Sequence, residues 1–361
     1  MLIQKRGLQL TMFMFLSGIL LANSAQGLTF QKDICNLIVH PFLDTDDPLS
    51  EQRIIEHRDA NGLSLYFSRK IDKPVCLSKT CLPLSLIVLW DGAGNFKGLE
   101  FTEGEPLTKT DHTDFTKDDY RKLNKILSNK SSVLGMLQKE DLILEDKRKL
   151  LEDGVDAYSG ATQPSLYDQV VRDAVYTCYT LWNTAYGATQ RKILAILDQK
   201  ADGRYLNMAF QQNETGYLLW AIDHLTRYPE YHKRFYRKVT KHIRSENNAL
   251  AQRALDYFTP ARMADLEVQK ALVQELAKEK QLDVIWKLTA FENLDGSVIE
   301  MLLQRYKTGK LDVTELGYVL KMITGKHLAN PNVEVALQNF LNDNNRYVRH
   351  ITLEVLKKYK K

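Results

Sequence analysis

Apolar side chains recur every three or four residues from Pro164 almost to the end of the chain. This spacing places them on one face of a helix. Short joints containing Asn, Asp or Gly separate one helical stretch from the next, so the apolar faces can be buried only by packing helix against helix. We expect one helix with the buried face Leu166, Val170, Ala174, Cys178, Leu181 and Ala185, and further helices near Ala249–Phe258, Ala264–Glu279, Gln281–Ala290, Ser297–Lys307, Val313–Met322, Asn332–Asn342 and Arg346–Lys357.

The last of these helices indicates a repeat. The stretch FLNDNNRYVRHITLEVLKKY has an apolar helix end, a joint rich in Asp and Asn, then Val348-Arg349 and a second apolar helix. It resembles one HEAT-type repeat, and ENNALAQRALDYF (Glu246 to Phe258) is a weaker echo of it. We therefore expect residues 205–361 to form an all-α region of HEAT-like repeats. An ordinary helical bundle is the alternative.

Ahead of this region the pattern changes to that of a mixed α+β domain over residues 28–190. Strands are expected at Gly62–Ile71, Leu84–Trp90 and Phe96–Phe101, and the turn residues Asp91 to Asn95 join the last two into a hairpin. A helix should begin at Thr116, because acidic residues occupy its first turn. A second helical stretch is expected from about Lys139 to Leu151.

The first 27 residues have the three parts of a secretory signal peptide. Lys5 and Arg6 give a basic start, Leu8 to Ala22 is apolar, and small residues follow up to Gly27. An uncleaved anchor is the alternative, although the apolar core is shorter than the roughly 20 residues of a membrane span. We expect an exported protein in the periplasm, which would associate with a membrane only through a partner or an uncleaved signal.

Charge and cysteine content narrow the possible ligands. The chain has 49 Lys and Arg against 45 Asp and Glu, a near balance that gives no reason to expect nucleic acid as a partner. In an exported protein Cys76 and Cys81 could form a disulfide with each other, or one of them with Cys35. No metal site is expected, since these thiols lack partners at zinc spacing. Cys178 should be a buried thiol.

A short loop just before Pro164 is the main candidate for a binding site. The stretch DGVDAYSGATQPSL places Ser159, Gly160, Ala161 and Thr162 together ahead of the expected helix. In the simplest interpretation Thr162 caps that helix and the glycine makes a turn. In the functional interpretation the small side chains let a bulky group approach the backbone, and Thr162 offers its hydroxyl to a phosphate at the helix N-terminus.

The residues Asp156-Ala157-Tyr158-Ser159-Gly160-Ala161-Thr162 resemble the flavinylation motif of the FMN-binding domain family, Asp-x-x-(Ser/Thr)-Gly-Ala-Thr. That family includes the FMN-carrying subunits of the sodium-pumping NADH:quinone oxidoreductase and of the Rnf complex. The upstream LIVLWDGAGNFKGLEF is similar to the family's hairpin. The resemblance covers about a third of the chain. Three features depart from the family's pattern: the motif is followed by Gln163-Pro164, where a hydroxyl residue is more usual, the segment from Thr116 to Leu151 is charged, and the C-terminal half is helical.

This resemblance implies a cofactor and a partner. In the family a flavin transferase links FMN through its phosphate to the final threonine, outside the cytoplasmic membrane. By resemblance, Thr162 carries covalent FMN, and Asp156, Ser159, Gly160 and Ala161 complete the cofactor-binding motif. The expected function is extracytoplasmic electron transfer with an unidentified redox protein, as a carrier rather than a self-contained enzyme.

Two other interpretations stand beside the flavoprotein. One is a non-enzymatic helical-repeat interaction protein whose N-terminal domain holds no flavin. The other is a hydrolase, which the sequence disfavours because it contains no G-x-S-x-G or H-E-x-x-H motif. His112 is expected to be a turn residue rather than a base. An aromatic ring near the motif could stack on the flavin, but most are expected to pack in the core: Tyr158, Tyr167, Tyr176, Tyr179 and Trp182.

Overall fold

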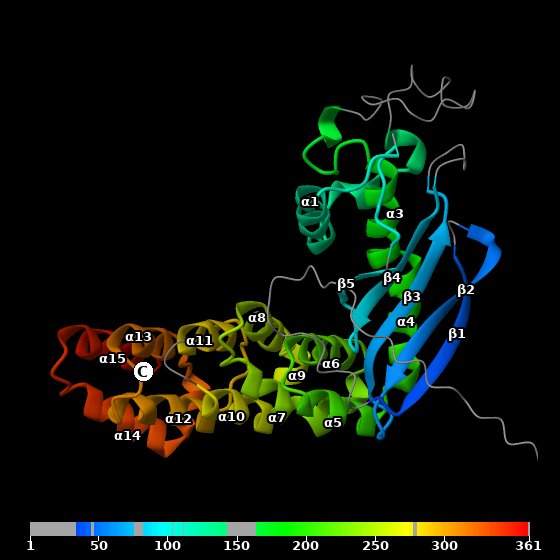
Figure 1. Ribbon diagram of the computed structural model, residues 1–361. Helices are drawn as coiled ribbons and strands as arrows, with labels where there is room; N and C mark the ends of the chain where they lie inside the picture. The colour runs from blue at the N-terminus through cyan, green and yellow to red at the C-terminus, as the bar shows by residue number, and fades with distance from the viewer. Residues whose placement is uncertain are drawn as a thin grey trace, which may run out of the picture. The chain divides into compact units, whose positions relative to one another are not determined.

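A computed structural model describes residues 34–44, 47–75, 82–102, 104–110, 112–142, 164–276 and 280–359 (Figure 1). The chain divides into two compact units, Met1–Lys200 and Ala201–Lys361. The predicted signal peptide, Cys76 and Cys81 lie outside the described residues, so the export and disulfide predictions stay predictions.

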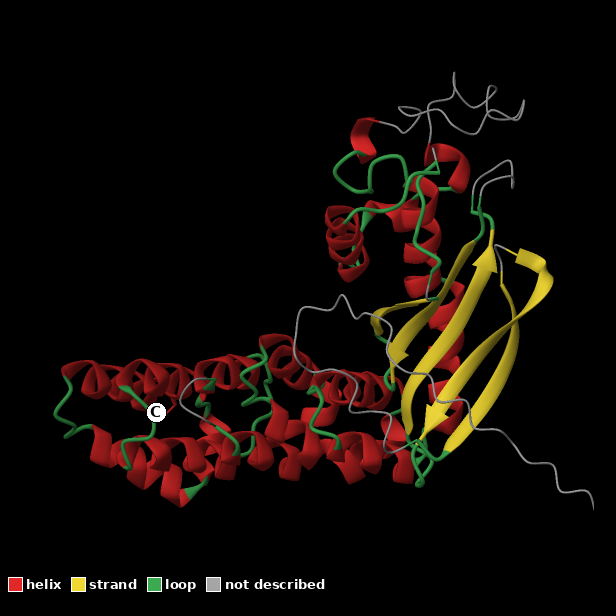
Figure 2. Ribbon diagram, in the orientation of Figure 1, coloured by secondary structure: helices red, strands yellow, loops and turns green. Residues whose placement is uncertain are grey.

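The first unit is built on a five-stranded antiparallel sheet in which each strand pairs with its neighbours in sequence (Figure 2). The pairing is continuous from one edge strand to the other, with Phe67 opposite Trp90 and Ile87 opposite Glu100. The strands are β1 (Asn36–Asp44), β2 (Asp47–Arg58), β3 (Ser64–Lys73), β4 (Leu84–Asp91) and β5 (Phe96–Phe101). The predicted strands correspond to β3, β4 and β5, whereas β1 and β2 were not predicted.

The predicted hairpin between β4 and β5 is confirmed, and Asp91 holds its turn. One carboxylate oxygen of Asp91 accepts hydrogen bonds from the backbone N–H groups of Ala93 at 2.9 Å and Asn95 at 2.8 Å. Gly94 has a φ of +80°, a backbone conformation that glycine adopts without strain. The turn is therefore fixed by the residues from which it was predicted.

Two helices, α3 (Val175–Tyr186) and α4 (Ala188–Lys200), pack against the sheet. Alternate residues of β3 and β4 point toward them, and Phe67, Leu86, Val88 and Trp90 are fully buried there. The indole N–H of Trp90 donates to the carbonyl of Ala185 on α3 at 2.8 Å. This hydrogen bond satisfies the polar atom of the largest side chain in the core.

Helix α1 (Lys117–Ser128) begins where the sequence predicts. The Thr116 side chain accepts a hydrogen bond from the backbone N–H of Asp119, and the Asp119 carboxylate accepts one from the backbone N–H of Thr116. This reciprocal pair is a capping box. Lys139 begins only the short 3₁₀ turn η3 (Lys139–Leu142), and the rest of the helix predicted there lies outside the described residues. A second 3₁₀ turn, η2 (Val133–Met136), lies between α1 and η3.

The predicted helix over Leu166 to Ala185 is wrong in its first half. Pro164 begins the three-residue 3₁₀ turn η4 (Pro164–Leu166), and α3 starts only at Val175. Asp173, with a φ of +57°, has a left-handed backbone that breaks any helix before α3. Leu166 and Val170 are nevertheless buried, so their spacing correctly predicted burial but not the backbone conformation.

The second unit is entirely helical in its described residues, with helices packed in two rows. Helix α8 packs on α6, and α11, α13 and α15 follow one another in the same row. The other row contains α7, α10, α12 and α14, and Figure 1 shows both rows. The helices are α5 (Gly203–Gln211), α6 (Thr215–Arg227), α7 (His232–His242), α8 (Asn248–Asp256), α9 (Pro260–Met263), α10 (Leu266–Gln274), α11 (Gln281–Thr289), α12 (Gly296–Lys307), α13 (Val313–Met322), α14 (Pro331–Phe340) and α15 (Arg346–Tyr359), with short 3₁₀ turns η5 (Pro229–Tyr231) and η6 (Gly325–Ala329).

Arginine side chains form hydrogen bonds to backbone carbonyls in two of the joints between these helices. Arg349 donates to the carbonyls of Asp343 at 2.6 Å and Asn344 at 3.1 Å, and Arg305 donates to Leu276 at 2.7 Å. These carbonyl groups lie in the joints just beyond α14 and α10, and the guanidinium groups give them hydrogen-bond partners. The fold class is thus an α+β unit followed by an all-α unit, as predicted at that level.

Candidate functional site

The predicted cofactor motif lies outside the described residues. Asp156, Ser159, Gly160, Ala161 and Thr162 all fall within the undescribed stretch 143–163. The next described residue is Pro164, in a 3₁₀ turn too short to have a substantial helix dipole. We expected an α-helix to begin just after Thr162 and to bind a phosphate at its N-terminus. The residues that follow Thr162 form only this short turn, so they do not provide that binding site.

An open cavity of about 560 Å³ lies at one end of the sheet in the first unit. Its size is within the range of sites that bind small molecules and cofactors. The walls come from the end of β3, the start of β4, the loop after β5 and the start of α3. The lining residues are Lys70, Asp72, Val75, Leu82, Pro83, Leu84, Ser85, Thr102, Glu105, Pro106, Leu107, Thr108, Lys109, Thr110, His112, Asp114, Asp173, Ala174, Tyr176 and Thr177.

The loop after β5 is fixed to the segment that precedes α3. The backbone N–H and the side-chain hydroxyl of Thr110 both donate to the carbonyl of Asp173, at 2.7 and 2.6 Å. His112 and Asp173 both have a positive φ, +63° and +57°, which is uncommon for residues other than glycine. Two such residues in one cavity wall mark it as a candidate functional site, since backbone strain tends to cluster at such sites.

The charges around the cavity are unevenly balanced. Lys70 pairs with Asp72 at 3.2 Å, and Lys109 pairs with Asp119 of α1 at 2.9 Å. Both lysines of the lining are thus paired with carboxylates, and Asp173 pairs with Arg172 at 3.4 Å, while Glu105 and Asp114 add further carboxylates. The cavity is better suited to an uncharged ring with hydrogen-bonding edges than to a phosphate, which these carboxylates would repel.

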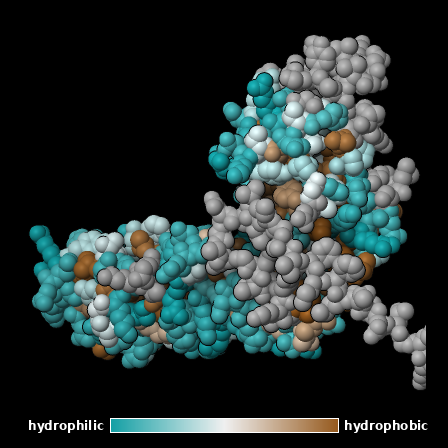
Figure 3. Space-filling model, in the orientation of Figure 1, coloured by the Kyte–Doolittle hydropathy of each residue, from teal (hydrophilic) through white to brown (hydrophobic). Residues whose placement is uncertain are grey.

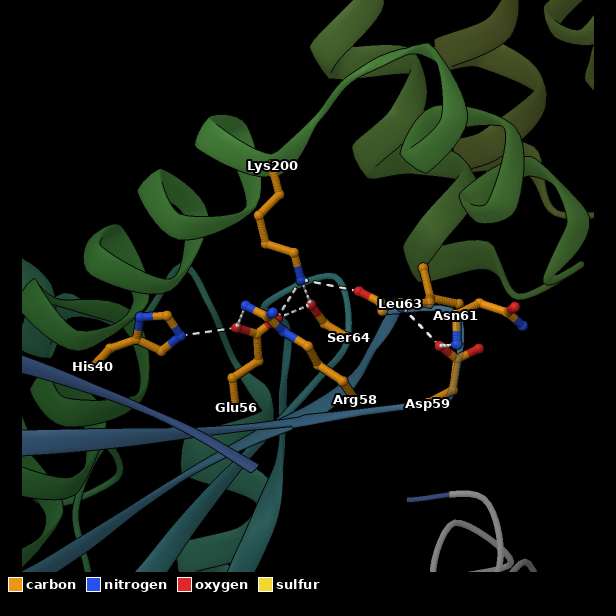
Figure 4. Close-up of polar contacts among 9 residues, drawn as sticks. His40, Glu56, Arg58, Asp59, Asn61, Leu63, Ser64 and Lys200 are labelled. Atoms are coloured by element: carbon orange, nitrogen blue, oxygen red, sulfur yellow. Dashed lines mark hydrogen bonds and ion pairs between the residues drawn. The ribbon is translucent and has the colours of Figure 1, made fainter. Parts of the chain in front are cut away.

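A second polar cluster surrounds Glu56 on the helix-covered face of the sheet (Figure 4). The Glu56 carboxylate is fully buried and accepts hydrogen bonds from Arg58 at 2.6 Å and Ser64 at 2.5 Å. It also contacts Nε2 of His40 at 2.8 Å and the ammonium group of Lys200, the last residue of α4. The cluster joins three strands to the end of one helix.

The surroundings of Glu56 argue against a role as a general acid or base. Burial alone would raise the pKa of this carboxyl, but the hydrogen bonds from Arg58, Lys200 and Ser64 outweigh it and lower the pKa to about 2. A carboxylate ionised across the physiological range exchanges no proton during a reaction near pH 7. Burial lowers the pKa of Lys200 despite its pairing with Glu56. We assign the cluster a structural role.

The remaining candidates from the sequence occupy turn, core and surface positions. The backbone N–H of His112 donates to the carbonyl of Lys109 in a turn, as predicted. Cys178 is a fully buried thiol whose pKa burial raises to about 12, also as predicted. Of the aromatic residues, Tyr176 is buried, while Tyr179 and Trp182 donate to the carbonyls of Leu137 and Asn129. Tyr167 is half exposed, and Tyr158 lies outside the described residues.

Within the described ranges, no group of three or more His, Cys, Asp or Glu side chains is arranged to hold a metal ion. The described helices include none that is both long enough and apolar enough to cross a bilayer. No family model matches the chain, and comparisons with curated proteins and with solved structures found no match.

Proposed function

We propose that this chain is an exported flavoprotein that carries FMN in phosphoester linkage on Thr162 and transfers electrons outside the cytoplasm. The observation that carries the proposal is the motif Asp156 to Thr162, which meets every fixed position of the flavinylation pattern. The basic and apolar start of the chain agrees with it, because export would bring the motif to where the modification is made. When bound, the flavin supplies the redox chemistry, and the protein positions it.

The cavity supports this proposal as a seat for the flavin ring. It is the right size for a cofactor, and Asp173 in its wall follows Thr162 by only eleven residues. Hydroxyl groups of Thr108, Thr110 and Thr177 can bond the edges of an uncharged ring. Because the lining carboxylates repel a phosphate, the phosphate would lie outside the cavity, held by its covalent bond to Thr162.

The test is to express the exported protein together with a flavin transferase. Thr162→Ala should abolish acid-stable yellow colour in the denatured protein without unfolding it, and Thr162→Ser should retain some colour because the hydroxyl remains. Asp156→Ala should reduce loading but shift the melting temperature by only a few degrees, as surface substitutions do within about 0.5 kcal/mol. Colour that persists in Thr162→Ala, or normal loading of an unstable Asp156→Ala, would refute these assignments.

A HEAT-like repeat array is our proposal for the second unit. Helices α8, α11, α13 and α15 begin at Asn248, Gln281, Val313 and Arg346, a spacing of 32 to 33 residues. Such regular spacing is typical of repeats that stack on their neighbours, although it is shorter than the roughly 40 to 47 residues of most HEAT repeats. Stacking buries each helix pair against the next and leaves an extended surface available to a protein partner.

The alternative function is a flavin-free interaction protein built on this array. One observation favours it: the 3₁₀ turn η4 provides no helix N-terminus to bind a phosphate next to Thr162. Expressing residues 1–200 and 201–361, the two compact units, separately distinguishes the two. The flavoprotein proposal predicts that the first piece accepts flavin and the second retains partners from the exported fraction. A first piece that stays colourless while the second retains partners would favour the alternative.

A further inference from the structure

Helix α7 and the residues at its two ends form a strongly basic surface on the second unit. From Tyr231 to Ser245 the chain contains no acidic residue, and Glu230 and Glu246 bound this stretch. The apolar side chains Phe235 and Val239 are buried, so the helix has one inward face. The other faces carry six basic residues, all exposed except the half-buried Lys238: Lys233, Arg234, Arg237, Lys238, Lys241 and Arg244.

Only part of this charge is neutralised within the protein. Arg237 pairs with Glu267 at 3.3 Å, and Arg244 pairs with Glu275 at 2.8 Å. No carboxylate in the described part of the chain pairs with Lys233 or Lys241. Because like charges repel, keeping these cations on one helix disfavours the unbound state, and an anionic partner would relieve that repulsion.

The surface lacks what a protein interface usually needs. Stable protein interfaces have a desolvated core of aromatic or aliphatic side chains. No large apolar side chain of α7 is exposed, and the nearest exposed ring is that of Tyr228, 37 % exposed, just ahead of the helix. Figure 3 shows that most of the visible surface of the second unit is hydrophilic. Spread positive charge with a ring at one end is sufficient to bind anionic lipid headgroups.

We propose that the basic surface of α7, defined by the six basic residues above, docks the second unit on an anionic phospholipid bilayer. The contact is electrostatic and lies at the headgroups, since α7 presents no apolar face to insert. Binding should therefore weaken as salt screens the charges. The proposal does not depend on whether the first unit carries flavin.

The experiment is co-sedimentation of the exported protein with vesicles of phosphatidylglycerol and phosphatidylcholine, compared with phosphatidylcholine alone. We expect binding only to the anionic vesicles, lost at high salt. The double variant Lys233→Gln/Lys241→Gln should bind about 30-fold more weakly, because each basic residue near such a surface contributes about fivefold. The matched control Lys357→Gln/Lys358→Gln removes two exposed lysines of α15 and should bind as the unaltered protein does.

Several results would overturn the proposal. Equal binding to neutral vesicles, or binding unchanged in Lys233→Gln/Lys241→Gln, would mean that the uncleaved N-terminal segment or another surface holds the protein. An equal loss in both variants would mean that overall charge matters rather than α7. Retention on an acidic polypeptide or on heparin with no vesicle binding would assign the surface to another kind of partner. Circular dichroism of each variant, which should be unchanged, excludes unfolding as the cause.

Discussion

Replacing Glu56 by Gln should destabilise the first unit by about 3 kcal/mol at pH 7. The pKa of this carboxyl falls from its ordinary 4.5 to about 2 on folding, and 2.5 pH units correspond to about 3 kcal/mol. Lys200, whose pKa is already lowered by burial, stays buried in the variant but loses its carboxylate partner, so the cost of burying its charge adds to the loss. The glutamine keeps the shape of the side chain but removes the charge that Arg58 and Lys200 face.

The pH dependence distinguishes this account from a simple packing defect. Because the folded pKa lies below the unfolded value, the unfolded chain binds the proton more readily. The contribution of Glu56 is therefore complete above about pH 5 and is lost as the pH falls toward 2. The difference between the two proteins should narrow over the same range.

The assay is hydrogen exchange of the β2 and β3 amides in increasing urea, which reports the stability of the first unit alone. Glu51→Gln, an exposed position on the same strand, is the control and should change stability by no more than about 0.5 kcal/mol. A Glu56→Gln difference that is the same at pH 7 and pH 3, or one no larger than the control, would refute the reasoning.

Two further predictions concern packing. Cys178 should resist alkylation at pH 8 until the protein unfolds, because burial raises its pKa to about 12. Rapid labelling of the folded protein would show that this thiol is accessible to solvent. Gly135→Ala should destabilise the first unit by about 1 to 3 kcal/mol, since a Cβ there would lie 2.4 Å from the Trp182 ring. The midpoint of urea unfolding measures this loss. An unchanged midpoint would show that the indole can move away from the added methyl group.

Elements fixed by local chemistry could be predicted from the sequence. The turn at Asp91 depends on a carboxylate that bonds its own backbone, and α1 begins at a capping box that four residues define. The helix Val313–Met322 was predicted with the bounds it has. In each case the signal lies within a few residues, where propensity and capping act.

The strands β1 and β2 could not be predicted from the local sequence. A half-buried strand is recognised by alternating apolar and polar residues, but Glu56 occupies a buried position of β2 and Asp44 one of β1. These charges are tolerated because partners distant in sequence meet them: Lys200 for Glu56, and Arg69 for Asp44 at 2.7 Å. The same limit applies to the cavity, whose walls join four separate segments that no local pattern connects.

The central claim is that Thr162 carries FMN, and intact-mass measurement of protein from the exported fraction of a host that has the flavin transferase tests it most directly. We predict a mass increase equal to one FMN joined with loss of water, absent from Thr162→Ala and present in Ser165→Ala, which removes an exposed hydroxyl three residues away. An unmodified mass in protein from that host, or the same increase in Thr162→Ala, would contradict the account.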